Sequence, residues 1–145
     1  MPGGRRPAAA SGLLAIAADG DLALTASRAR ELAESAPQSA AVLATLGTVL
    51  AREGRIAEAQ QAYFKALTAE PDNPFHAFNL AVALDKLHKY PQAREYYERA
   101  IALAERASVA QGTGLPLAEI RRRLAELSTV RRNGEKSSVS EPGTR

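Results

Sequence analysis

The sequence predicts an all-α fold, a right-handed α-solenoid of about three stacked helical hairpins with a C-terminal capping helix. Two observations carry this prediction. Alanine and leucine, both strong helix formers, make up about a third of the 145 residues. The pattern of apolar and small residues also repeats with a period that fits one helical hairpin.

The repeat becomes visible when the chain is compared with itself at an offset of about 34 residues. Residues 40–73 and 74–107 are two complete units by this comparison, and matched positions keep the size and polarity of the side chain. The segment before them matches poorly, so we expect residues 8–39 to form a degenerate first hairpin, with helices at 8–18 and 21–35. The matches pair Leu46 with Leu80, Leu50 with Leu84, Ala59 with Ala93, Tyr63 with Tyr97, Ala66 with Ala100 and Leu67 with Ile101.

Each complete unit is predicted to contain two helices. Between residues 41 and 53, leucines recur three and four positions apart, and Gly54 ends this helix. The second helix starts soon after the glycine and stops at Pro71. In the next unit, Asn73 is a good N-cap and Pro74 suits the first helical position.

Small residues at fixed positions predict where the helices approach closely. Gly47 and Ala81 occupy the same place in the two first helices, and alanines recur in the second helices. Side chains of this size let helix axes approach to about 8–10 Å. Tyr63 and Tyr97 are expected to fill the wider gaps.

The segments 78–84 and 90–101, with the equivalent positions of the preceding unit, resemble the tetratricopeptide repeat family. The resemblance covers residues 40–107, about half of the chain. The tryptophan usual in the first helix of this family is replaced by Leu43 and Ala77. The resemblance implies that the first helix of each unit lines a concave surface, where such proteins bind a segment of another protein.

A capping helix is predicted at residues 115–130. Pro116 can open it, and Ile120, Leu124 and Leu127 lie on one apolar stripe, which leaves the opposite side polar. Such a helix shields the apolar end of an open stack.

The remaining segments are predicted from their composition. The last repeat helix is expected to run on to about residue 111. Residues 1–7 and 133–145 are rich in glycine, proline, serine and charge, and are expected to be disordered tails. Residues 8–18 follow two arginines and could also be a weak signal segment, but a helix is the favoured interpretation.

The sequence offers little for catalysis. It has no cysteine and only two histidines. We expect His76, on the first turn of its helix, to be solvated and His88 to be a turn residue. No glycine-rich phosphate loop is present either. We therefore expect no enzyme activity, no catalytic residue, no metal site and no cofactor.

The candidate binding site is the concave groove. Phe78 and Val82 could contact an apolar side chain, Asn79 could bond a peptide backbone, and Arg52 with Lys86 could bind a carboxylate. The complete set of predicted groove residues is Thr45, Thr48, Arg52, Phe75, Phe78, Asn79, Val82 and Lys86. One subgroup of the family binds the C-terminal carboxylate of a chaperone through a lysine and an asparagine on one helix, but here Ala44 and Thr48 stand at those positions. That particular site is not expected.

The sequence thus predicts a protein-protein interaction module that binds a peptide or helix of another protein. The alternative is a structural or assembly subunit, for example of a bacterial pilus, secretion or envelope complex, or a homo-oligomer that covers exposed apolar repeat surface. A third possibility is that basic residues at 121–123, 131 and 132 tether the chain to acidic lipid or nucleic acid. Nucleic acid is not expected, because residues 11–115 contain two more acidic than basic residues.

The expected location follows from hydropathy. No apolar run approaches the roughly 20 residues that a membrane-spanning helix needs. We expect a cytoplasmic protein, with a periplasmic or envelope-associated location as the alternative.

Overall fold

The computed structural model describes residues 22–107 and 114–138, and for residues 131–138 it describes the helical backbone only. Within these ranges the chain forms helices and no strand. The helices are α2 (Leu22–Ser35), α3 (Ala40–Arg52), α4 (Ile56–Ala69), α5 (Pro74–Lys86), α6 (Tyr90–Ala107) and α7 (Leu117–Ser138).

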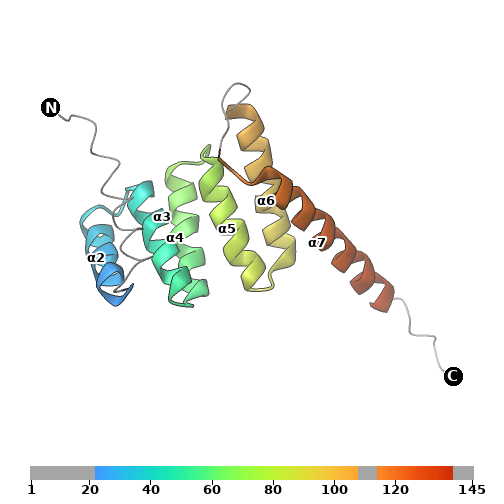
Figure 1. The fold of residues 1–145 in the computed structure, drawn as a ribbon, viewed down its shortest axis with the longest axis horizontal. Helices are drawn as coiled ribbons and strands as arrows, with labels where there is room; N and C mark the ends of the chain where they lie inside the picture. Colours follow the sequence, from blue (N-terminus) through green and yellow to red (C-terminus); the bar gives the residue numbers. More distant parts are fainter. Residues whose placement is uncertain (1–21, 108–113, 139–145) are drawn as a thin grey trace.

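The helices stack side by side in chain order, which confirms the predicted α-solenoid (Figure 1). The hairpins α3–α4 and α5–α6 correspond to the two predicted units, and α4 packs against α5 to join them. Helix α2 packs against α3 and takes the place of the second helix in the degenerate first hairpin. The other predicted helix of that hairpin, at 8–18, lies outside the described residues.

Local signals set the helix ends. The cap at Asn73 agrees with the prediction, and Ser39 is a second cap that was not predicted. The Ser39 hydroxyl accepts a hydrogen bond from the Val42 amide at the start of α3, and the Asn73 side chain accepts one from the Phe75 amide at the start of α5. Within each hairpin the turn contains one residue with positive φ, Gly54 at 80° and His88 at 60°. His88 is therefore the turn residue that the repeat predicts.

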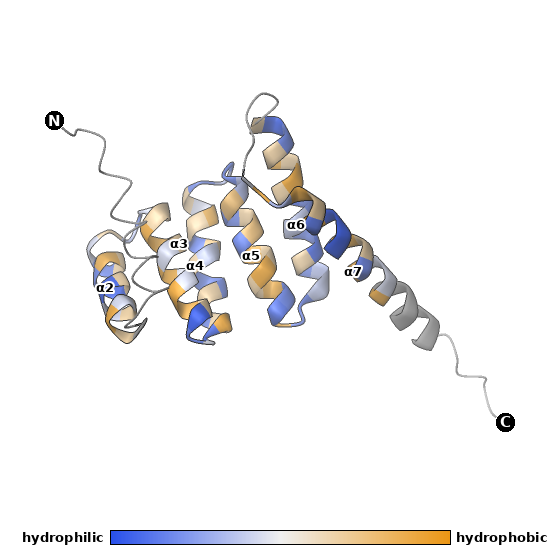
Figure 2. Cartoon of the chain, viewed as in Figure 1, coloured by the Kyte–Doolittle hydropathy of each residue, from blue (hydrophilic) through white to orange (hydrophobic). Residues whose placement is uncertain are grey.

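The core consists of leucine, isoleucine, alanine and tyrosine side chains, and the tyrosines pack against the small residues. A Cβ atom added to Gly47 would lie 2.6 Å from Cε1 of Tyr63, so this position admits no side chain without rearrangement. At the equivalent position of the next hairpin, Ala81 is fully buried, and Tyr97 is buried in the same cluster. Figure 2 shows how apolar and polar residues alternate around each helix.

Helix α7 crosses the end of the stack and extends beyond it (Figure 1). Ile120 and Leu127 are buried against the last hairpin, in agreement with the predicted apolar stripe. The helix continues to Ser138, so the expectation of a disordered tail from residue 133 is wrong for its first six residues. The physical reason is that Gly134 alone costs a helix only about 1 kcal/mol. Our predictions for three further segments fall outside the described residues. These segments are 1–7, 108–111 and 139–145.

The expectation of a solvated His76 is also wrong. The side chain is buried, with 5% of the residue exposed, because it lies one turn before Leu80 on the core face of α5. Its Nε2 atom lies 3.0 Å from Oε2 of Glu70, and among the described residues its Nδ1 atom has no hydrogen-bond partner. Hydrogen bonds from Asn73 and His76 lower the pKa of Glu70. The same one-turn spacing, read from the sequence, would have placed this histidine correctly.

Candidate functional site

The predicted groove residues come from α3 and α5, but Thr45 is not accessible to a partner. Only 6% of Thr45 is exposed, and its hydroxyl donates a hydrogen bond to the Ala41 carbonyl at 2.9 Å. Thr45 lies one turn before Val49, which packs against Ala26 and Ala29 of α2. The prediction that Thr45 lines the groove is therefore wrong, because α2 covers this side of α3.

Thr48 is half-buried, and its hydroxyl already makes two hydrogen bonds. It donates to the Ala44 carbonyl at 3.1 Å and lies 3.0 Å from the hydroxyl of Tyr63. Burial raises the pKa of Tyr63, so this phenol stays protonated. Thr48 thus fixes the ring that packs on Gly47, and its first role is structural.

The apolar part of the groove lies on α5. Phe78 and Val82 are half-buried and line a shallow hollow of about 240 Å³ between α5 and α7. The Phe78 ring packs on Tyr97, with ring centroids 6.3 Å apart, so one side of Phe78 belongs to the core. Phe75, at the start of the same helix, is 44% exposed.

Three polar side chains flank this apolar surface. Asn79 is half-buried, and within the described part of the chain its amide has no hydrogen-bond partner. Lys86 is exposed one turn beyond Val82 and, among the described residues, has no ion-pair partner. Arg52 is exposed at the C-terminal end of α3. Asn79, Val82 and Lys86 are therefore accessible on α5, and their role in binding stays a prediction.

Helix α7 forms the other wall of the hollow, which sequence analysis did not foresee. The carboxylate of Asp85 on α5 accepts hydrogen bonds from Nε and Nη2 of Arg123 at 2.8 and 2.7 Å. It also accepts one from the Tyr97 hydroxyl at 3.0 Å. The Arg123 guanidinium, and after it Tyr97, holds the pKa of Asp85 below its usual range. Burial and the neighbouring carboxylate raise the pKa of Tyr97.

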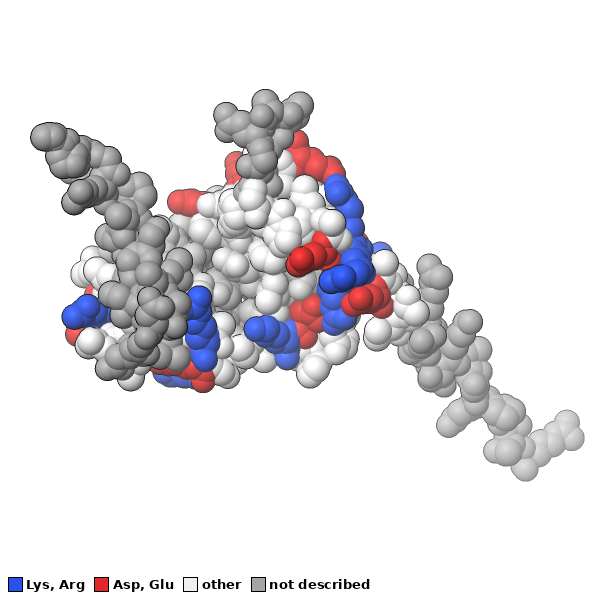
Figure 3. Space-filling model, viewed as in Figure 1, with Lys and Arg blue, Asp and Glu red and all other residues white. Residues whose placement is uncertain are grey.

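Glu119, Ile120 and Arg122 complete this wall. Figure 3 shows acidic and basic side chains close together over α7, while the central surface over α5 carries no charge. Within the described residues, neither Glu119 nor Arg122 makes a hydrogen bond or ion pair. Their charges are available to a bound molecule.

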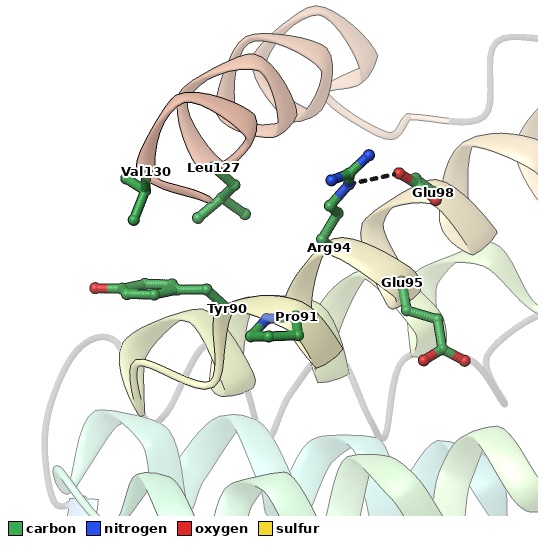
Figure 4. A pocket seen from close by; sticks show the side chains of 7 residues that line it. All are labelled: Tyr90, Pro91, Arg94, Glu95, Glu98, Leu127 and Val130. Carbon is green, nitrogen blue, oxygen red and sulfur yellow. Dashed lines mark hydrogen bonds and ion pairs between the residues drawn. The ribbon is translucent and has the colours of Figure 1, made fainter. Parts of the chain in front are cut away.

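A second cleft, of about 560 Å³, lies between the start of α6 and the distal half of α7. In Figure 4, Leu127 and Val130 point from α7 toward Tyr90 and Pro91. The acidic edge of this cleft includes Glu98, which pairs with Arg94 at 3.0 Å. The two residues are four positions apart, so this is an exposed charge pair within one helix.

No group of three histidine, aspartate or glutamate side chains within the described ranges could hold a metal ion. Among the described helices, none combines the length and the hydropathy that crossing a membrane requires. The fold is that of a helical-repeat protein.

The chain belongs to the tetratricopeptide repeat family. The family model matches twice, at residues 40–73 and at residues 77–107, which correspond to the hairpins α3–α4 and α5–α6. The resemblance derived from the sequence is thereby confirmed. No curated protein matches the chain in sequence.

Solved structures with the same fold include bacterial and fungal proteins. The type III secretion translocator chaperone SycD of Yersinia enterocolitica has a TM-score of 0.75 and 13% identity, over 85% of this chain and 83% of that chain. PcrH, solved in complex with the chaperone binding region of PopD, has a TM-score of 0.69 and 18% identity, over 90% and 99%. The Sgt2 domain from Aspergillus fumigatus has a TM-score of 0.68 and 18% identity, over 93% and 83%. At these identities the likeness establishes the fold alone.

Proposed function

We propose that this protein binds a segment of another protein on the face formed by α3 and α5, and that it acts by binding rather than by catalysis. The observation that carries the proposal is the combination on α5 of an apolar surface and a free amide. Phe78 and Val82 present apolar surface, and Asn79, between them in sequence, has no partner within the described residues. A peptide backbone supplies both a donor and an acceptor for such an amide.

The fold relatives support this proposal. SycD is a translocator chaperone, and PcrH was solved with the chaperone binding region of PopD. Both relatives are helical solenoids that interact with another polypeptide. We infer that the present chain does the same, with its partner identified by the experiment below. The cytoplasmic location stays a prediction.

The test compares partner capture by matched amide variants. Wild-type protein, Asn79→Ala and Gln61→Ala are used as baits in a lysate of the source organism, and captured proteins are quantified. Gln61 is exposed on α4 and makes no hydrogen bond within the described residues, so Gln61→Ala is the matched control. We expect Asn79→Ala to lose a set of proteins that Gln61→Ala retains.

A Phe78→Ala variant extends the test to the apolar surface. Because Phe78 also packs on Tyr97, its thermal unfolding is measured alongside, and capture is compared at a temperature where the variant is fully helical. Equal capture by wild type, Asn79→Ala and folded Phe78→Ala would show that this face is not the binding site.

The alternative, an assembly subunit, is favoured by one observation. Leu24 and Leu32 on α2 are 45% and 40% exposed, which is high for leucine at the end of a stack. If the protein self-associates through this end, the sedimentation coefficient of the wild type should rise with protein concentration. In a Leu24→Ser, Leu32→Ser double variant the coefficient should stay at the value of the monomer. A monomer at all concentrations would reject the homo-oligomer.

A further inference from the structure

Helix α2 presents leucine side chains on a side that it does not use to pack on α3. Ala26 and Ala29 contact Val49 of α3. Leu24 and Leu32 are about two helical turns apart, on a side of α2 other than that of the two alanines, and they are 45% and 40% exposed. This side of α2, defined by Leu24 and Leu32, is called the leucine face below.

The two ends of the described stack differ (Figure 1). At one end α7 covers the last hairpin, where Ile120 and Leu127 are buried. At the other end, among the described helices, α2 packs on α3 alone, whereas α4 packs on both α3 and α5. Open ends of helical-repeat stacks expose apolar surface that a terminal element has to cover. The leucine face is therefore where such an element is expected.

The segment directly before α2 has the composition of such an element. Residues 8–18, which lie outside the described part of the chain, include six alanines and no charged residue. Their large side chains are Leu13, Leu14 and Ile16. As a helix, these 11 residues would be about 16 Å long at 1.5 Å per residue, which is enough to cover the roughly 12 Å that the leucine face spans.

The connection between this segment and α2 matches the turns within the two complete hairpins. Helix α2 begins at residue 22, so residues 19–21 form a connection of three residues. The middle residue is Gly20, which stands 34 positions before Gly54, the middle residue with positive φ in the turn of the next hairpin. A connection this short returns the chain antiparallel beside α2. The turns of the complete hairpins, also of three residues, are 53–55 and 87–89.

We propose that residues 8–18 bind in cis along the leucine face, antiparallel to α2, and that they prevent a second copy of the chain from docking there. A segment joined to its site by a short linker has an effective concentration in the millimolar range. A second copy at about micromolar concentration therefore has to bind about a thousandfold more tightly to displace it. This inference is independent of the proposed function, because the proposed binding face lies on α3 and α5.

The first test places a spin label near the C-terminal end of α2. The chain has no cysteine, so Ser35→Cys, at an exposed position, carries a single nitroxide on the full chain labelled with ¹⁵N. Antiparallel docking brings residue 8 closer to the label than residue 18, although residue 8 is farther away along the chain. We expect the amide signals of residues 8–11 to lose more intensity than those of residues 15–18. Intensity loss that only declines with distance along the chain from α2 would overturn the docking.

Two controls separate docking in cis from other contacts. A label at Val130→Cys, an exposed position on α7 at the other end of the stack, should leave the signals of residues 8–18 unchanged. The same signals should stay unchanged in a mixture of ¹⁵N wild type with spin-labelled Ser35→Cys protein that carries no ¹⁵N. Signal loss in this mixture would show that the segment reaches a second copy, and it would overturn docking in cis.

The second test concerns self-association. A Leu13→Asp, Ile16→Asp variant should release the segment, so its sedimentation coefficient should rise with protein concentration towards the value of a dimer. Replacing both leucines of the leucine face with serine in this variant should restore the monomer. Gly3→Asp, Gly4→Asp is the matched control, because it adds the same two charges outside the segment and should stay monomeric. A released variant that stays monomeric would overturn the block, and so would a wild type that associates through the leucine face.

Discussion

The carboxylate of Asp85 and the guanidinium of Arg123 form a two-pronged ion pair between α5 and α7, at 2.7 and 2.8 Å. The two residues are 38 positions apart. The pair does two things at once. It fixes the capping helix beside the apolar hollow, and it neutralises the one carboxylate of α5 that would otherwise face that hollow.

Replacing Arg123 with alanine is expected to lower the free energy of unfolding by about 1–2 kcal/mol. The loss is moderate because the arginine side chain is 36% exposed, although Asp85 is only 14% exposed. Urea unfolding followed by circular dichroism measures it. Arg121→Ala is the control, since its pair with Glu105 is exposed on both sides and should contribute less than about 0.5 kcal/mol. Equal effects of the two substitutions would contradict a special role for the Asp85–Arg123 pair.

Acid should weaken the same contact. Because the folded state holds the pKa of Asp85 below its ordinary value of about 3.9, the ionised carboxylate stabilises the fold above that pH. This stabilisation is lost as the pH falls through the lowered pKa of the folded state. The difference in unfolding free energy between wild type and Asp85→Asn is therefore expected to be full at about pH 6 and to shrink below about pH 4. A difference that stays constant down to about pH 2 would refute this assignment.

Gly47→Ala is expected to destabilise the protein although alanine is the better helix former. The helical preference favours alanine by about 1 kcal/mol, but overpacking typically costs about 1–3 kcal/mol. A Cβ atom 2.6 Å from the Tyr63 ring is far inside contact distance, so the steric term should dominate. Urea midpoints provide the measurement. In a Tyr63→Ala background the clash is absent, and the same substitution should become neutral or stabilising; an unchanged penalty would argue against the clash.

Gly54→Ala tests backbone strain without any steric contact. The residue has φ of 80°, and no atom lies within 4 Å of an added Cβ. The left-handed conformation costs a residue with a side chain about 1–2 kcal/mol, so the urea midpoint should fall. The urea midpoint of Gly54→Asn should fall less than that of Gly54→Ala, because asparagine tolerates this conformation better. Equal midpoints for both variants and wild type would show that the turn can relax.

Much of the fold could be predicted because its signals are local. The offset of one hairpin, the cap at Asn73 and the turn at Gly54 each depend on residues within one or two helical turns. The close approach of helices at Gly47 also followed from the size of the residues in the repeat. Periodicity further indicated the buried stripe of α7, although it did not indicate how far the helix continues.

The candidate site was only partly predictable because accessibility depends on neighbouring elements. Thr45 has the spacing of a groove residue, but α2 covers it. From the sequence, Glu119 and Arg122 could be assigned only to the polar side of a capping helix. Nothing near them in sequence indicates that they line a hollow beside α5. Their place beside Phe78 and Val82 depends on the direction in which α7 leaves the last hairpin.

By itself, the sequence determined which segments are helical, where the hairpins turn and which small residues let the helices meet, because these properties depend on side-chain size and on contacts within a turn. Only the tertiary structure decided that Thr45 is covered and that α7 becomes a wall beside Phe78. Those outcomes arise from packing and from one ion pair between distant segments. The periodicity of residues along the chain does not indicate which distant residues will come into contact.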